Sequence, residues 1–116
     1  MQAAYKTVNL EEGMPYCDAA IRRLTAELHT ARAQKYAALK LIHGYGSSGT
    51  GGRLRVEVRR YLGACVRKGL IKGFIPGESF EIFDKDTQSA LMRHSFLSRD
   101  SDLGRHNNGI TLVFFT

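Results

Sequence analysis

Two apolar stripes of helical period, each preceded by a short apolar strand, constrain this 116-residue chain more than any other feature. The first stripe recurs every three or four residues and predicts an amphipathic helix over residues 15–33; its members are Cys17, Ile21, Leu24, Leu28 and Ala31. The second predicts a helix that ends before Gly69 and consists of Leu54, Val58, Tyr61, Leu62 and Cys65. Strand–helix–strand units give right-handed crossovers and parallel strands, so the pattern predicts helices packed on a sheet.

Four segments are predicted strands: residues 6–10, 39–42, 71–75 and 110–115. The second is apolar on both faces, as expected of an interior strand. Residues 77–108 are less regular and hold one short helix, capped by Asp84 or Asp86 and running through Arg93. The chain is therefore predicted to be a single domain over residues 1–116. Its fold class would be an α/β (α+β two-layer) sandwich with a mixed four-stranded sheet and an inserted segment before the last strand.

Length and charge narrow the classes of function. The chain is long enough for one hydrophobic core, and it has no apolar run near 18 residues and no export leader. We therefore expect a soluble, cytoplasmic protein without a membrane partner. The net charge is +6, and residues 53–68 alone contain six lysines and arginines against the single acidic Glu57. A positive field concentrated on one helix favours a phosphate-bearing partner.

The loop between the second strand and the second helix is rich in glycine, with five glycines among residues 44–52. Gly44, Gly46 and Gly49 match the GxGxxG pattern of dinucleotide-binding folds. That reading also needs an acidic residue at the end of the next strand, and "IKGFIP" has none. The loop is also not a Walker A loop, because no Gly-Lys-Ser/Thr follows it.

A different anion site fits this loop better. Glycines allow the backbone to approach a ligand closely, and the N–H groups at a helix start favour an anion. Arg53 and Arg55 in the first helical turn would each be unfavourable by about 0.3–1 kcal/mol without a bound anion. We therefore predict that the loop and the first helical turn hold a phosphate.

His43 lies at the end of the second strand, directly before this loop. The neighbouring arginines are expected to lower its pKa, so its imidazole should be neutral near pH 7. A neutral imidazole can act as a general base or donate to a phosphate, but a lone histidine is equally often structural, and both readings stay open. Parallel strands place the loops after the first two strands at one sheet edge, which would bring Asn9, Glu11 and Glu12 near His43.

The stretch "IHGYGSSGTGGRLR" resembles the signature of the small MutS-related (Smr) domain family, and the resemblance extends over residues 6–72 and 107–115. It implies a two-layer βαβαββ sandwich similar to the C-terminal domain of translation initiation factor 3. It also implies nucleic-acid binding and, in many members, endonucleolytic cleavage. By the same resemblance His43 and Gly44 take the histidine–glycine position, and Arg55 is a phosphate contact; the loop glycines are Gly46, Gly49 and Gly51.

The first strand departs from the family pattern of Leu-Asp-Leu followed by a basic residue. The chain has Asn9 at the position of the aspartate and Glu11 at that of the basic residue. An amide cannot act as a base, so the resemblance implies binding more directly than cleavage.

Three hypotheses follow. The leading one is largely sequence-independent binding of DNA or RNA through the glycine loop and four arginines: Arg53, Arg55, Arg59 and Arg60. The second is a phosphodiesterase in which His43 is the general acid or base, Arg55 stabilises the pentavalent phosphate, and Glu11 or Glu12 orients water or a divalent metal; no other cofactor and no built metal site is expected. The third is a protein-interaction module without nuclease activity, formed by apolar residues of the segment 78–105.

Overall fold

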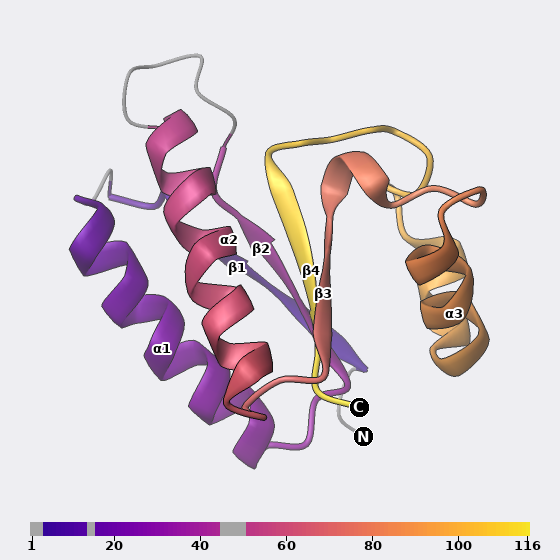
Figure 1. Ribbon diagram of the computed structural model, residues 1–116, viewed down its shortest axis with the longest axis horizontal. Coiled ribbons are helices and arrows are strands. Elements are labelled where there is room, and N and C mark those ends of the chain that lie inside the picture. Colours follow the sequence, from indigo (N-terminus) through magenta and orange to yellow (C-terminus); the bar gives the residue numbers. More distant parts are fainter. Residues whose placement is uncertain (1–3, 14–15, 45–50) are drawn as a thin grey trace.

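The computed structural model describes residues 4–13, 16–44 and 51–116, and it has the predicted order of elements (Figure 1). The strands are β1 (Tyr5–Asn9), β2 (Ala38–Ile42), β3 (Gly73–Pro76) and β4 (Ile110–Phe114). The α-helices are α1 (Cys17–Ala33), α2 (Gly51–Arg67) and α3 (Lys85–Arg93). Two short 3₁₀-helices, η1 (Gly77–Ser79) and η2 (Ser95–Arg99), flank α3.

The four strands form one mixed sheet in the order β1-β2-β4-β3. β1 and β2 are parallel, with Val8 opposite Leu41, whereas β4 runs antiparallel to both of its neighbours. β2 therefore lies inside the sheet, as its apolar sequence predicted. The predicted mixed α/β sandwich is confirmed.

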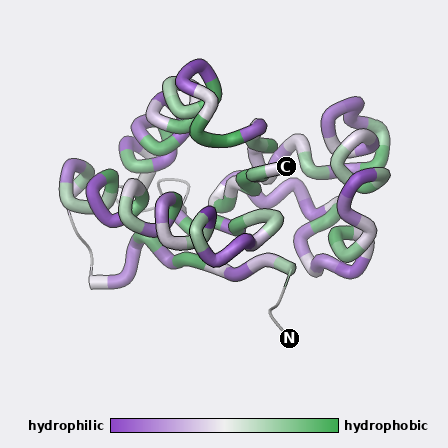
Figure 2. The backbone as a smooth tube through the Cα atoms, turned by 90° about the horizontal axis from the view of Figure 1, so that it is seen from below, coloured by the Kyte–Doolittle hydropathy of each residue, from purple (hydrophilic) through white to green (hydrophobic). Residues whose placement is uncertain are grey.

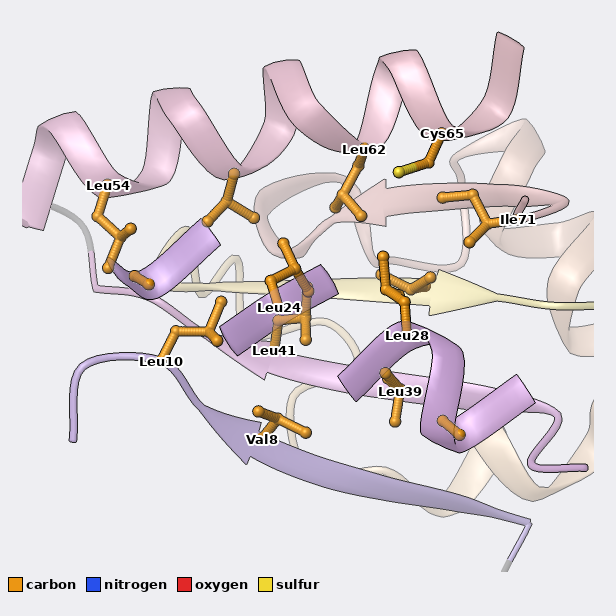
Figure 3. Close-up of a cluster of buried hydrophobic side chains, with 14 residues drawn as sticks. Val8, Leu10, Leu24, Leu28, Leu39, Leu41, Leu54, Leu62, Cys65 and Ile71 are labelled. Carbon is orange, nitrogen blue, oxygen red and sulfur yellow. The ribbon is translucent and has the colours of Figure 1, made fainter. Parts of the chain in front are cut away.

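The main core lies between the sheet and the two long helices, which pack side by side on one face (Figure 1). Alternate strand residues such as Val8, Leu39 and Leu41 point to this face. They meet the predicted helical stripes, of which Figure 3 labels Leu24, Leu28, Leu54, Leu62 and Cys65. Along the helices, hydrophilic and hydrophobic residues alternate, as Figure 2 shows, because each helix has one buried side.

The second face of the sheet is covered in part by the inserted segment, which carries α3 on the side opposite to α1 and α2 (Figure 1). A smaller core forms there between the insert and the strands; its buried members are Ala38, Ile75, Phe80, Ala90, Leu97, Leu112 and Phe114. The helix in the insert begins as predicted, because the Asp84 carboxylate accepts a hydrogen bond of 2.9 Å from the Thr87 backbone N–H.

Most element boundaries shift by one or two residues from the prediction, and the starts of β3 and α2 matter most for the site. β3 begins at Gly73 rather than at Ile71, and Ile71 packs into the main core just before the strand. α2 begins at Gly51, so the helix includes residues that the sequence assigned to the loop. Of the other positions predicted for these elements, Pro15, Gly46 and Gly49 lie outside the described residues. No helix in the described part of the chain is long and apolar enough to span a membrane.

Candidate nucleic-acid interface

The carboxyl ends of β1 and β2 meet at one edge of the sheet, as predicted. The Leu10 N–H donates to the Ile42 carbonyl at 2.8 Å, and the Asn9 side chain accepts from the Glu11 N–H at 2.9 Å. The Glu11 carboxylate lies directly against Gly44, which has a φ of +76°, and would collide with any Cβ at that position. The positive φ favours glycine at position 44, whereas the Glu11 carboxylate is the end of a flexible side chain and could move aside.

β4 completes this edge. The N–H groups of His43 and Gly44 both donate to the Gly109 carbonyl, at 3.0 and 3.1 Å. The edge therefore combines the ends of β1 and β2 with the start of β4, and the chain enters the glycine loop directly from it.

His43 is fully buried at this edge, under α2. Its Nδ1 lies 2.8 Å from the Gly44 carbonyl oxygen and its Nε2 lies 2.8 Å from the Thr111 hydroxyl. Because a carbonyl only accepts, Nδ1 carries the proton and Nε2 accepts from Thr111. Burial lowers the pKa of His43 to about 4, and Arg59 and Arg55 contribute to the same direction. The neutral imidazole that the sequence predicted is confirmed, but burial is a larger cause than the arginines.

This geometry bears on the predicted catalytic role of His43. Both ring nitrogens are engaged by the protein, and the side chain has no solvent-accessible surface. To transfer a proton to or from a substrate, the ring would first have to break its hydrogen bond with Thr111. In the structure His43 joins β2 to β4; catalysis by His43 stays a prediction.

Arg59 also serves the framework. Its Nη1 and Nη2 donate to the Glu78 carboxylate at 2.8 and 2.7 Å, its Nε donates to the Thr111 hydroxyl at 3.2 Å, and its Nη2 also reaches the Ile110 carbonyl at 3.3 Å. Although burial alone would raise it, these bonds from Arg59 hold the pKa of Glu78 below its ordinary value. Arg59 ties α2 to η1 and β4, so its guanidinium already has partners in the fold; its predicted contact with phosphate stays a prediction.

A row of exposed arginines runs along the outer side of α2. Arg53, Arg60 and Arg67 repeat every seven residues, close to two helical turns, so they share one side of the helix. We call these three residues the arginine stripe; it spans about 21 Å at the usual helical rise. Arg60 lies 3.3 Å from Glu57 in an exposed pair, and neither Arg53 nor Arg67 has an ion pair within the described part of the chain. The sequence analysis selected Arg53 and Arg60 but missed Arg67, whose heptad spacing was the available signal.

The remaining predicted contacts lie around the start of α2. Arg55 is partly buried. Its charge contributes to lowering the pKa of both His43 and Glu78, so it lies on the side of α2 that faces these two residues. Gly51 is the first residue of α2, and Gly44 lies at the sheet edge that leads into the loop.

Charge is distributed unevenly over the molecule. The two long helices, α1 and α2, together contain eight arginines against three acidic residues, a net of +5. Residues 77–109, the insert, contain four against six, a net of −2. The helical layer is therefore the positive side of the protein and the insert the mildly negative one.

A buried ionic network joins the insert to the sheet, and the sequence analysis did not find it. Lys40 Nζ donates to Asp100 at 2.7 Å and to Asp102 at 2.6 Å, and the Tyr5 hydroxyl donates to Asp100 at 2.5 Å. Asn107 donates to the other Asp102 oxygen at 3.1 Å. Although burial lowers it, the pKa of Lys40 is raised overall by the two carboxylates; burial and the bond to Asp100 raise the pKa of Tyr5 to about 12. Only the fold brings these residues together, since Lys40 and Asp100 are 60 positions apart.

Two hollows adjoin these features. A cavity of about 390 Å³ opens on the second face of the sheet; its lining includes Glu11, Lys40, Ile42, Gly44, Asp102 and Ile110. A groove of about 450 Å³ lies between the C-terminal parts of α1 and α2 and includes His29, Arg32, Tyr61 and Lys68. Within residues 4–13, 16–44 and 51–116, no group of three or more histidine, cysteine and acidic side chains is arranged to hold a metal ion.

Comparisons of the chain with protein-family models, with curated proteins and with solved structures find no match.

Proposed function

We propose that this protein is an Smr-like domain that binds nucleic acid through its phosphate backbone. The observation that carries the proposal is the arginine stripe: three exposed guanidinium groups on one side of α2, of which two have no ion pair within the described residues. Arginine forms strong bidentate hydrogen bonds with phosphate, and contacts of this kind carry no sequence information.

The surroundings of the stripe support the same partner. The helices α1 and α2 carry a net of +5, which attracts a polyanion, and the N-terminus of α2 offers backbone N–H groups and a positive dipole end. Because α2 begins at Gly51, only Arg53 lies in its first turn, which has no acidic residue, and Arg55 follows in the next turn. Unlike Arg59, the stripe can engage a ligand without giving up bonds that hold the fold.

The binding proposal is tested by fluorescence anisotropy with labelled duplex DNA, single-stranded DNA and RNA at about 50 and 200 mM salt. Three phosphate contacts predict a salt slope near −2.7 and a loss of about 40-fold in affinity between these concentrations. Replacing the arginine stripe (Arg53→Gln, Arg60→Gln and Arg67→Gln together) is expected to remove most of the affinity and of the salt dependence.

A matched variant keeps the change in net charge but moves it to the insert. It combines Lys85→Gln, Arg93→Gln and Arg99→Gln, all exposed positions. It should bind nearly as well as the wild type. Equal losses in both triple variants would mean that only net charge matters, and no binding to any nucleic acid at about 50 mM salt would contradict the proposal.

Cleavage receives less support from the geometry. Glu11 is exposed at the sheet edge, but His43 is enclosed by Gly44 and Thr111. A plasmid-nicking and RNA-cleavage assay with and without Mg²⁺ or Mn²⁺ tests it. Cleavage by the wild type that is lost in His43→Ala would add nuclease activity to binding, and no cleavage under any of these conditions would leave binding alone.

The insert provides one observation for the protein-interaction alternative. Phe80 and Leu97 are buried and Phe96 is partly buried, but Phe83 and Met92 are 82% and 88% exposed. Light scattering of the wild type and of Phe83→Ser with Met92→Ser distinguishes the cases. A dimer that the double variant loses would favour an interface at these two side chains.

A further inference from the structure

The cavity on the second face of the sheet has a mixed lining that the phosphate contacts do not use. Ile42 and Ile110 are apolar walls, and Glu11, Lys40 and Asp102 contribute polar groups. Its volume of about 390 Å³ falls at the lower end of the range for small-molecule sites, about 300–1,000 Å³. The volume and the mixed lining therefore suit a small ligand that has both apolar and polar atoms.

Lys40 is held rigidly in this cavity and has a hydrogen bond to offer. Its side chain is 10% exposed, and two of its three N–H donors bind Asp100 and Asp102. The third has no partner among the described residues. A nearly buried ammonium with a spare N–H is best satisfied by an acceptor atom of a ligand, because an unmade buried hydrogen bond is costly.

Two carboxylates add acceptors. The Glu11 carboxylate makes no hydrogen bond or ion pair with any described residue and lies against Gly44 at the cavity wall. Asp102 is fixed by Lys40 and Asn107 and keeps further lone pairs. The cavity thus offers one cationic donor beside two anionic acceptors. The ionic network holds Lys40 and Asp102 in place, whereas the Glu11 carboxylate has no partner among the described residues.

Among the nucleobases this pattern matches guanine. The Watson–Crick edge of guanine presents an acceptor, O6, next to two donors, N1–H and N2–H₂. Uracil and thymine present two acceptors and one donor, and cytosine and adenine have no donor at the ring nitrogen of this edge. We propose that the cavity binds a guanine base, with Lys40 donating to O6 and the Glu11 and Asp102 carboxylates accepting from N1–H and N2–H₂.

The cavity lies near the proposed nucleic-acid interface. The part of the inference that concerns a nucleic-acid strand, rather than a free nucleotide, rests on the proposed function. Gly44 lines the cavity and also leads into the loop before α2, so the two sites share one sheet edge. A strand whose phosphates contact α2 could place one unpaired base over this edge into the cavity. Enzymes that read extruded bases use the same edge contacts. Free guanine nucleotides offer identical chemistry, so the test includes both sources.

The test compares single strands of about ten nucleotides by anisotropy at low salt. One strand is uridine only, and the others carry a central guanosine, cytidine or inosine. The guanosine strand is expected to bind about tenfold more tightly than the uridine strand, and inosine, which lacks N2–H₂, should fall between them. In Glu11→Gln the guanosine preference should drop below about twofold, whereas it should persist in Glu12→Gln, an exposed neighbour with the same charge change.

A second measurement separates this inference from the proposed function. Guanosine monophosphate is titrated into the wild type and Glu11→Gln while the Gly44 and Gly109 amide signals are followed by NMR. Strand binding without base preference overturns the guanine pocket and leaves backbone binding. Binding of the mononucleotide, lost in Glu11→Gln, without binding of any strand supports the pocket and contradicts the proposed function. If neither strands nor mononucleotide bind, both are overturned.

Discussion

Single side chains at the sheet edge form a continuous polar chain through the interior. The His43 ring accepts from Thr111, Thr111 accepts from Arg59, and Arg59 donates to Glu78. Buried polar groups are costly when unpaired, so each member depends on the next. Two residues that the sequence marked as chemical, His43 and Arg59, thus also join β2, β4, α2 and η1, through Thr111 and Glu78, which the sequence did not mark.

Thr111→Val removes the central hydroxyl of this chain. We expect the free energy of unfolding to fall by about 1–3 kcal/mol, because His43 Nε2 and Arg59 Nε each lose a partner at a buried site. Urea denaturation, monitored by circular dichroism, measures this free energy. Thr7→Val, the same change at an exposed position of β1, should stay within about 0.5 kcal/mol. Equal effects of the two substitutions would contradict the role given to Thr111.

His43 should make stability depend on pH. Its pKa is about 4 in the folded protein and about 6.5 in the unfolded chain, so the unfolded state binds more protons between these values. The contribution is fully present above pH 6.5 and is lost as the pH falls towards 4. It amounts to no more than about 3 kcal/mol.

The measurement compares wild-type and His43→Asn unfolding free energies from pH 4 to 7. An asparagine is neutral throughout, so the variant should show a shallower decline over this window. If both proteins lose stability in parallel, the pH dependence has another origin.

Among the elements, α2 divides its arginines between two tasks. Arg59 on one side binds Glu78 and Thr111, whereas the arginine stripe on the outer side is exposed. The helix itself is held by its apolar side, where Leu54, Val58 and Leu62 enter the main core. An element fixed by its core contacts can present charge on its outer side without cost to the fold.

Arg60→Gln and Arg59→Gln should therefore have opposite consequences. Arg60→Gln is expected to reduce the salt slope of nucleic-acid binding by about 1 and to leave the unfolding free energy within about 0.5 kcal/mol of the wild type. Arg59→Gln should lower the unfolding free energy by about 1.5–3 kcal/mol, because it breaks the charged hydrogen bonds to Glu78. Anisotropy and urea denaturation on both variants check this. An Arg59→Gln variant of unchanged stability would show that its bonds to Glu78 and Thr111 contribute nothing.

The molecule as a whole is a sheet between two unlike layers. The helices on one face carry the positive charge, and the insert on the other carries the second small core and the ionic network. Lys40 is the point at which the sheet and the insert are joined by charge, through Asp100 and Asp102. This contact and the second hydrophobic core both join the insert to the sheet, next to the cavity that Lys40 and Asp102 line.

Lys40→Met should loosen the insert. It leaves Asp100 buried without its cation, which is expected to cost about 3–5 kcal/mol of unfolding free energy and to speed proteolysis after residues 99–105. Lys6→Met on the neighbouring strand removes a more exposed pair with Glu27 at 3.2 Å and should cost at most about 1 kcal/mol. Denaturation of both variants measures the unfolding free energy, and limited trypsin digestion measures the rate of proteolysis. Equal protease resistance of the two variants would mean that the ionic network does not hold the insert in place.

Local pattern was enough to predict the elements of this protein. The apolar stripes of α1 and α2, the interior character of β2, the Asp84 cap of α3 and the positive charge of α2 are all properties of neighbouring residues, and each is present in the structure. The tertiary structure alone showed that β4 lies between β2 and β3, that His43 is enclosed, and that Arg59 is bound to Glu78.

The physical reason is distance along the chain. A helical period repeats within a few residues, but Lys40 and Asp100 are 60 residues apart and His43 and Thr111 are 68 apart. A lysine in an apolar strand or a histidine before a glycine does not indicate its partner until the sheet order is known. The sequence therefore predicted that His43 and Arg59 could do chemistry but not Lys40, Asp100 or Asp102, and the packing of β4 and the insert determined the partners of all five.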